Sequence, residues 1–385
     1  MIYLDNSATT PLCAEAREGM LAAMECFGNP SSLHAAGAQG AKLLQQSRAA
    51  VAEALGERYL KDGQLIFTGS GTEATALALL GTARAKARRT ASTILTTDSE
   101  HPSVHQNLAI LEKEGFKIVK VPTRGGNLDM STVLSHCNKD LFAVSMMLVN
   151  NETGALYPVA EVFRAAKAAN PDCICHCDAV QGFLKVPMTV KSLGADLITI
   201  SAHKIHGPKG VGALFVSPRL LERRALVSVY GGGGQEFGFH SGTENMVGIA
   251  GFAAACSKAN AQKAAFNAQT GVLSAKLIAA LEGSEIRCNL PAKRAPHIVS
   301  ITLPDIKSET MLHFLDSKGI AVSAGSACSS HAKAPSGTLL AFGLSPAEAD
   351  CTLRVSFSLE NTEADVDALV SALFEGVEKL VRIHH

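Results

Sequence analysis

Asp196-Leu-Ile-Thr-Ile200 is an apolar run that predicts a buried parallel strand, and Ser201-Ala-His-Lys204 follows it directly. In sheets of this kind, reactive groups gather just past the carboxyl ends of the strands. Lys204 stands at that place, and the turn Gly207-Pro-Lys-Gly210 prevents the chain from continuing as a helix. A partly desolvated lysine can form a Schiff base with an aldehyde. The same sequence would also fit an ordinary lysine in a surface loop.

The composition of the 385-residue chain limits the classes of protein to which it can belong. Its length predicts two or three domains, and 47% hydrophobic residues are enough for a large core. The 35 basic and 35 acidic residues balance, which argues against nucleic acid or an anionic membrane as the main partner. We find no apolar run long enough to span a membrane and no signal-peptide pattern. We therefore expect a cytoplasmic protein whose ten cysteines are free thiols.

Three of these cysteines lie two residues apart in Cys173-Ile-Cys-His-Cys177, within a predicted strand. Residues at this spacing share one face of a strand, whereas structural zinc usually takes its cysteines from short turns. We therefore expect a thiol-lined core here and no metal.

Strand-like and helix-like segments alternate along most of the chain. The expected strands cover residues 65–68, 92–97, 116–121, 141–149, 173–177, 197–200 and 212–216. Repeated βα units predict an α/β fold with a doubly wound, mainly parallel sheet and helices on both faces. A long helix is expected over about 246–267, and the pattern after it is typical of a smaller α+β domain.

Three units are expected from this pattern. Residues 1–15 would form a segment that packs with the small domain, residues 16–267 the large domain, and residues 268–385 the small domain. The glycine loop Gly69-Ser-Gly-Thr-Glu73 lies in the large domain, between a predicted strand and a predicted helix. A helix start of this kind binds anions, although a tight turn capped by Thr72 would have the same sequence. No Gly-Lys-Ser/Thr follows, so it is not a Walker loop.

Polar side chains recur where the predicted strands end. They are Thr72, His101, Asn151, Asp178, Gln181, Ser201, His203 and Lys204. In a doubly wound sheet these strand ends meet at one crevice. A lysine, a carboxylate and an anion-binding glycine loop are together what pyridoxal phosphate needs, for its aldehyde, its ring nitrogen and its phosphate.

With these residues, the sequence resembles the cysteine desulfurases, which are pyridoxal-phosphate enzymes of fold type I in the class V aminotransferase superfamily. The matching segments run in family order along nearly the whole chain: Tyr3-Leu-Asp-Asn-Ser-Ala-Thr-Thr10, Gly28-Asn-Pro-Ser-Ser32 with His34, Phe67-Thr-Gly-Ser-Gly-Thr-Glu73, Ser99-Glu-His101, Val149-Asn-Asn-Glu-Thr-Gly154, Asp178-Ala-Val-Gln181, Ser201-Ala-His-Lys204 and Arg354-Val-Ser356. The resemblance implies a large domain with a mainly parallel sheet and a smaller α+β C-terminal domain.

The resemblance also implies a role for each matching residue. Lys204 would hold the cofactor as a Schiff base and move a proton. Asp178 would pair with the pyridine nitrogen and Gln181 with the ring hydroxyl. His101 would stack on the ring and act as an acid or base.

The remaining roles concern the phosphate and the substrate. Gly71, Thr72, Ser201 and His203 would bind the phosphate, and Thr243 would reach it from the neighbouring subunit of a homodimer. Asn151 would contact the cofactor and the substrate carboxylate, and the guanidinium fork of Arg354 suits the same carboxylate.

Cys328 selects the reaction that the resemblance implies. It lies in a stretch of small residues, Ala324-Gly-Ser-Ala-Cys328, which predicts a mobile loop rather than the buried position of most single cysteines. In the family this cysteine is the nucleophile. Its thiolate would take sulfur from L-cysteine as a persulfide, release L-alanine and pass the sulfur to an acceptor such as an iron–sulfur scaffold. His331 is a candidate neighbour by position alone.

Other readings stay open at this point. They are selenocysteine lyase activity, another class V aminotransferase or lyase, and an inactive relative that serves as a scaffold. Cys328 argues against a plain aminotransferase, and intact Lys204 and Asp178 argue against an inactive relative. Two segments depart from the family: no arginine precedes Ser241-Gly-Thr243, and Glu360 follows Ser358-Leu359 where relatives often have glycine.

Overall fold

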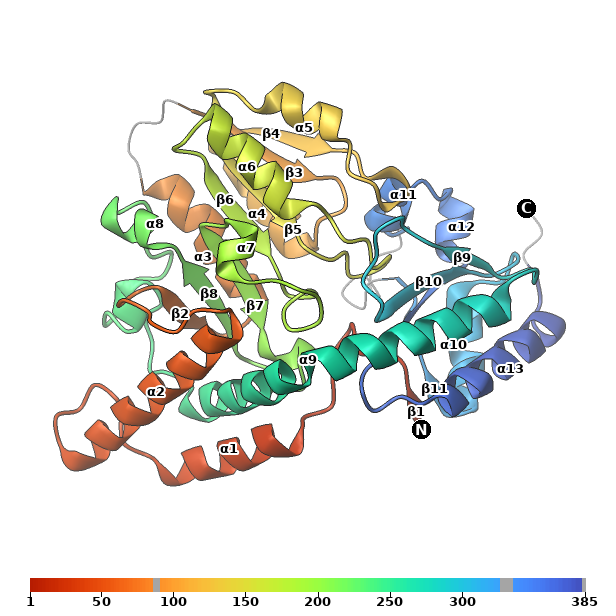
Figure 1. The fold of residues 1–385 in the computed structure, drawn as a ribbon, viewed down its shortest axis with the longest axis horizontal. Helices are drawn as coiled ribbons and strands as arrows, with labels where there is room; N and C mark the ends of the chain where they lie inside the picture. The colour runs from red at the N-terminus through yellow and green to blue at the C-terminus, as the bar shows by residue number, and fades with distance from the viewer. Residues whose placement is uncertain (86–90, 326–334, 383–385) are drawn as a thin grey trace.

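The computed structural model describes residues 1–85, 91–325 and 335–382, and its centre is a seven-stranded sheet (Figure 1). The strand order is β2 (Leu65–Thr68), β8 (Gly212–Val216), β7 (Leu197–Ser201), β6 (Ile174–Asp178), β5 (Leu141–Met147), β3 (Thr93–Thr97) and β4 (Lys117–Val121). In this sheet β8 alone runs in the direction opposite to the other six strands. The expected α/β fold with a mainly parallel sheet is therefore confirmed.

The direction of β8 follows from the short connection before it. Parallel neighbours need a long crossover, usually a helix, whereas antiparallel neighbours can be joined by a turn. Between β7 and β8 the chain has only residues 202–211, which form the short helix η2 (Ala202–Lys204) and a turn. The chain therefore reverses and places Lys204 at the carboxyl end of β7.

Helices cover both faces of the sheet, as expected for a doubly wound fold (Figure 1). One core lies under α2 (Ala35–Ala54), α5 (Met130–His136), α6 (Val159–Ala169), α7 (Val190–Leu193) and the first half of α9 (Met246–Leu281). The other lies under α3 (Gly71–Arg84), α4 (Pro102–Lys113) and α8 (Pro218–Glu222). Helix α1 (Ala14–Glu25) packs along α9. Cys173, Cys175 and Cys177 are buried in the first core, as predicted.

A smaller α+β unit follows the large sheet in the chain. Its antiparallel sheet has the order β12 (Thr352–Ser356), β10 (Ile298–Thr302) and β9 (Arg287–Asn289). Its helices are α10 (Ser308–Ser317), α11 (Gly337–Phe342), α12 (Pro346–Asp350) and α13 (Glu363–Lys379). The N-terminal strand β1 (Ile2–Tyr3) pairs in parallel with β11 (Ile320–Ala321), and Leu4 is buried in the core of this unit.

Helix α9 is longer than the sequence pattern led us to expect. We expected its end near residue 267, but the helix continues to Leu281 and passes from the large unit to the small one (Figure 1). Phe252 packs in the large core, whereas Leu277 packs in the small one. Its alanine-rich sequence favours helix throughout, so the change of packing partner leaves no break. Within the described ranges, no helix has both the length and the apolar character that crossing a membrane requires.

Candidate active site

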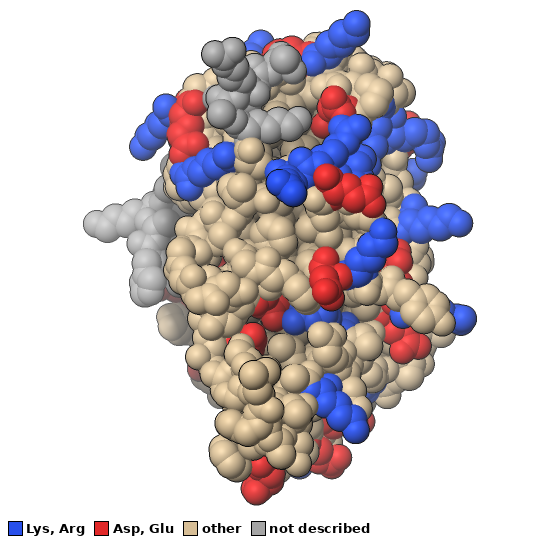
Figure 2. Space-filling model, turned by 90° about the vertical axis from the view of Figure 1, so that its left-hand side faces the viewer, with Lys and Arg blue, Asp and Glu red and all other residues tan. Residues whose placement is uncertain are grey.

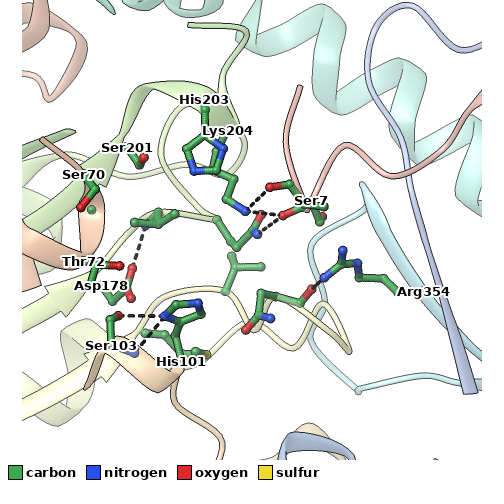
Figure 3. A pocket seen from close by; sticks show the side chains of 17 residues that line it. Ser7, Ser70, Thr72, His101, Ser103, Asp178, Ser201, His203, Lys204 and Arg354 are labelled. Carbon is green, nitrogen blue, oxygen red and sulfur yellow. Dashed lines mark hydrogen bonds between the residues drawn. The ribbon is translucent and has the colours of Figure 1, made fainter. Parts of the chain in front are cut away.

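A cavity of about 180 Å³ lies at the carboxyl ends of the parallel strands (Figure 3). Crossovers bring these ends to one edge of the sheet, so residues far apart in the sequence meet there. The predicted residues that line the cavity are Gly71, Thr72, His101, Asn151, Asp178, Gln181, Ser201, His203, Lys204 and Arg354.

Lys204 is held by the backbone of the N-terminal segment. Its Nζ donates to the carbonyl oxygens of Ser7 at 2.6 Å and Ala8 at 2.8 Å (Figure 3). The Ser7 oxygen also accepts a hydrogen bond from Gln181 Nε2 at 2.8 Å. The sequence assigns no role to Ser7 or Ala8, because backbone acceptors carry no signature in the sequence.

Asp178 is the last residue of β6 and lies among the cavity-lining side chains. Its Oδ1 accepts the backbone N–H of Val180 at 3.0 Å, and its Oδ2 has no hydrogen-bond partner among the described residues. Burial raises the pKa of the Asp178 carboxyl to about 6, against the opposing effects of the Val180 N–H and of Lys204. A second positive group near Oδ2 would therefore restore the ionised form.

His101 precedes the first turn of α4 and caps that helix. Its Nδ1 accepts the backbone N–H of Ser103 at 3.1 Å and lies 2.8 Å from the Ser103 hydroxyl (Figure 3). Because Nδ1 is an acceptor, the neutral ring carries its proton on Nε2. Burial, with smaller effects of Lys204 and His105, lowers the pKa of His101 to about 4. His101 is thus held as a neutral imidazole.

The start of α3 forms the anion-binding side of the cavity. The Ser70 hydroxyl accepts the Glu73 N–H at 3.1 Å, and the helix begins at Gly71. A Cβ at Gly71 would lie 3.2 Å from Val180 Cγ2 and 3.3 Å from Ser201 Cβ, closer than side chains normally approach. Glycine therefore lets the helix start come close to β7, with its unpaired N–H groups available to an anion.

These groups fit pyridoxal phosphate. The helix start with Thr72 and Ser201 could hold the phosphate, and the free carboxylate oxygen of Asp178 could hold the ring nitrogen. Gln181 Oε1 is buried and accepts no hydrogen bond from the residues that the structure describes. A ring hydroxyl could therefore satisfy this otherwise costly buried acceptor. Lys204 supplies the amine.

Arg354 reaches the cavity from β12 of the small unit. Its Nη1 donates to the Asn151 carbonyl at 2.9 Å, and its Nη2 donates to Asp5 Oδ1 at 2.8 Å. Its Nε is buried and has no hydrogen-bond partner in the described part of the chain. The guanidinium is thus already paired with one carboxylate, which the sequence did not reveal, because Asp5 and Arg354 are 349 residues apart.

Two further polar residues beside the cavity carry no assignment from the sequence. Glu100 is buried next to His101; its Oε1 accepts from Thr97 Oγ1 at 2.7 Å and from the Met147 N–H at 3.0 Å. Burial raises the pKa of Glu100 to about 8. Glu152 is also buried, and its Oε2 accepts from Ser336 Oγ at 2.6 Å.

One described residue that we predicted for the site does not line this cavity. Thr243 lines a separate cavity with Glu73, Glu236 and His240. Cys328, and with it His331, lies outside the described residues, although Gly325 and Ser336 on either side of that segment are both near Glu152.

Comparison with known proteins assigns this chain to one family. Residues 2–369 match the family described as Aminotransferase class-V. The cysteine desulfurase NifS of Azotobacter vinelandii is 36% identical over 375 residues, which are 96% of this chain and 90% of NifS. The chain belongs to the class-V aminotransferase family, among the cysteine desulfurases.

Solved structures of class-V aminotransferase relatives have the same fold. One, described as "NIFS-LIKE PROTEIN", is similar with a TM-score of 0.90 and 31% identity, over 98% of this chain and 100% of the other. Another, described as "SspA in complex with cysteine", has a TM-score of 0.79 and 27% identity, over 94% and 100%. The mixed sheet and the small α+β unit of this chain are therefore those of the class-V aminotransferase relatives.

Proposed function

We propose that this chain is a pyridoxal-phosphate-dependent cysteine desulfurase that converts L-cysteine to L-alanine and retains the sulfur on Cys328 as a persulfide. The observation that carries the proposal is the meeting of Lys204, Asp178 and His101 in one cavity of a chain that belongs to this family. The structure of SspA in complex with cysteine supports the same substrate class.

The chain's own groups would hold the cofactor on three sides. Lys204 would bind its aldehyde carbon, Asp178 its ring nitrogen, and the start of α3 with Ser201 its phosphate. His203, which lines the same cavity, would contribute to the phosphate side as the resemblance implies. When bound, pyridoxal phosphate supplies an electron sink that weakens the Cα–H and C–S bonds of an amino acid.

Each remaining step would belong to a named side chain. Arg354 and Asn151 would hold the substrate carboxylate, and Lys204 Nζ would move the proton at the substrate Cα. The Cys328 thiolate would form a bond to the substrate sulfur while the carbon–sulfur bond breaks. The substrate carbon would keep the electron pair and take up a proton, which gives L-alanine and a persulfide on Cys328.

A homodimer is part of the proposal, and two observations support it. Thr243 lines another cavity than Lys204, which suits a residue that would serve the site of a neighbouring subunit. Large apolar side chains of α1 and of the connection to α2 are exposed in the single chain: Leu21, Met24, Phe27 and Leu33. Uncharged side chains also make up most of the lower end of the face in Figure 2. A second copy would cover such a surface.

The units, the compartment and the acceptor complete the proposal. Residues 1–15 would act with the small domain at 268–385, and 16–267 would form the large domain. The protein would work in the cytoplasm and deliver sulfur to an acceptor protein, such as an iron–sulfur scaffold or a thiolation enzyme. The pairing of β1 with β11 supports the association of residues 1–15 with the small domain.

Turnover of L-cysteine under a thiol reductant tests the proposed activity. The holoenzyme should release sulfide and L-alanine in equal amounts, and Cys328→Ser should lose sulfide release while its visible absorbance stays unchanged. Cys26→Ser is the matched control, since Cys26 is a partly exposed thiol at the end of α1. Full sulfide release by Cys328→Ser would disprove the persulfide route. A preference for L-selenocysteine of more than a hundredfold would favour the lyase alternative.

A further inference from the structure

A second cavity, of about 60 Å³, shares the wall formed by Lys204 with the active-site cavity. We call it the side cavity. It is lined by Leu184 and Lys185 from the connection after β6, by α9 residues from Lys258 to Phe266, and by residues 357–360 after β12. The side cavity therefore lies where the large unit, α9 and the small unit meet, and nothing in the proposed reaction uses it.

Lys185 is the unusual residue of the side cavity. Only 5% of its surface is exposed, yet no hydrogen bond or ion pair joins its Nζ to any residue that the structure describes. A buried ammonium without a partner is costly, because it has lost its hydration and gained no counter-charge. Such a group either loses its proton or takes an anion.

The other charged groups around the side cavity do not compensate Lys185. Lys258 is itself a cation, and its Nζ lies 2.8 Å from Glu15 Oε2. Glu360 lines the cavity but is exposed and makes no ion pair with a described residue. Burial lowers the pKa of His206, which favours the neutral form of this ring. A space for negative charge thus remains at Lys185.

Several hydrogen-bonding groups of the lining are occupied, whereas Asn6 Oδ1 is buried and accepts no hydrogen bond from a described residue. Asn6 Nδ2 donates to the Ser356 carbonyl at 3.0 Å, and Thr10 Oγ1 donates to the His203 carbonyl at 2.9 Å. The rest of the wall includes the apolar side chains of Leu184 and Phe357. Lys204 and Lys258 already have partners, so Lys185 beside these apolar groups suits a ligand with a single anionic group and a short apolar body. The volume has room for about four or five non-hydrogen atoms, since one water needs about 10–15 Å³ on the same measure.

We propose that the side cavity is a binding site for a small carboxylate, with the carboxylate on Lys185 Nζ and the apolar part against Leu184 and Phe357. The site is separate from the one proposed for the substrate carboxylate at Arg354. Because its walls come from both units, an occupant would connect them next to Lys204.

The titration of Lys185 should make the affinity of the site for a carboxylate depend on pH. Burial lowers the pKa of Lys185 to about 7, and the charges of Lys204 and Arg354 act in the same direction. The other titratable groups around it are His203, His206, His297, Lys258 and Glu360. A carboxylate binds only the ammonium form, so its affinity should fall about tenfold for each pH unit above 7.

Titration of the holoenzyme with sodium propionate at constant ionic strength tests the proposal, with the unfolding midpoint and the ¹³C line width of the ligand as readouts. Saturable binding is expected at pH 6.5, at least tenfold weaker at pH 8.5, and at least tenfold weaker in Lys185→Met. Lys263→Met is the matched control, since Lys263 is on α9 but does not line the cavity. Its affinity should equal that of the wild type.

Ala259→Leu keeps Lys185 but fills the side cavity from α9, so it should also abolish binding. This second variant keeps the test valid if Lys185→Met fails to fold. Propionate that binds at Arg354 would be unaffected by either change. Wild-type affinity in Lys185→Met or in Ala259→Leu would therefore overturn the proposal, as would the absence of saturable binding. Sulfate that binds as tightly as propionate would overturn the assignment to a carboxylate.

Discussion

Arg354 Nη2 lies 2.8 Å from Asp5 Oδ1, and this ion pair joins β12 to the residue that follows Leu4 near the N-terminus. The residue proposed to hold the substrate carboxylate thus already has a carboxylate beside it. The pair is nearly buried, with side-chain exposures of 3% for Arg354 and 18% for Asp5. A substrate carboxylate would therefore share or compete for the same guanidinium.

Replacing Asp5 by asparagine separates these two effects. Asp5→Asn keeps an oxygen that can accept from Arg354 but removes the negative charge, so we expect tighter substrate binding and a KM for L-cysteine lower by about three- to tenfold. The free energy of unfolding should fall by about 1 kcal/mol, because the hydrogen bond from Arg354 then goes to a neutral acceptor instead of a charged one. Steady-state kinetics and urea unfolding measure both. A higher KM would mean that Asp5 mainly orients Arg354.

Asp178 should make the apoprotein less stable as the pH rises. Its pKa is raised from 3.8 to about 6 by burial, so the folded state binds a proton more readily than the unfolded state between these values. The wild type should then lose up to about 3 kcal/mol between pH 4 and pH 7 through this group, and Asp178→Asn should not. Urea unfolding of both apoproteins at pH 4.5, 5.5 and 7.5 measures the difference.

Asp129 provides a control, because its contribution to stability should change with pH in the opposite direction to that of Asp178. Hydrogen bonds from Ser131 and Thr132 lower the pKa of Asp129 to about 2, so its contribution is present above pH 4 and is lost as the pH falls. Asp129→Asn should therefore be less stable than the wild type at pH 7.5 and approach it in acid. If the difference in unfolding free energy from the wild type changed with pH in the same direction for Asp178→Asn and Asp129→Asn, the assigned environment of Asp178 would be contradicted.

His101 should remain neutral well below the ordinary pKa of histidine. Because its pKa is lowered to about 4, mainly by burial, its ¹⁵N shifts in the apoprotein should show a neutral ring with the proton on Nε2 at pH 5.5. Protonation of the folded ring should begin only in more acidic solution, whereas the free energy of unfolding should fall as the pH decreases from 6.5 to about 4, because the unfolded state takes up the proton first. His101→Gln identifies the signal. A midpoint between pH 6 and 7 would refute the buried, Ser103-bonded geometry.

Glu152 should fix the end of the segment that carries Cys328. Glu152→Ala leaves the Ser336 hydroxyl without its acceptor, which should cost about 1–3 kcal/mol of unfolding free energy. Sulfide release should fall by up to about 100-fold, since small displacements of reacting groups are costly. Glu152→Gln keeps an acceptor and serves as the control, with a loss of less than about 1 kcal/mol expected. Equal loss of activity in both variants would point to the charge instead.

The proposed homodimer predicts that apolar residues near α1 matter for association. Phe27→Ser with Leu33→Ser should shift the protein toward monomer in light scattering, because both side chains are almost fully exposed in the single chain. Tyr59→Ser is the control, since Tyr59 is as exposed but lies in another segment. A dimer that survives the double change would place the contact elsewhere.

The sequence alone determined the layered α/β fold and most of the residues in the cavity. Apolar runs such as residues 197–200 become buried strands because their period and length leave few alternatives. Polar residues directly after such runs, including Asp178 and Lys204, meet because parallel strands with helical crossovers end at one edge. Each of these inferences depends on local sequence and on a general rule of sheet topology.

Only the tertiary structure decided the partners of those residues. The bonds from Lys204 to Ser7 and from Arg354 to Asp5 join residues 197 and 349 positions apart. The isolation of Lys185 likewise depends on how α9 and the chain after β12 close around it. Contacts of this kind follow from how complete units pack in space, and neither periodicity nor residue type along one stretch records which distant atoms will meet.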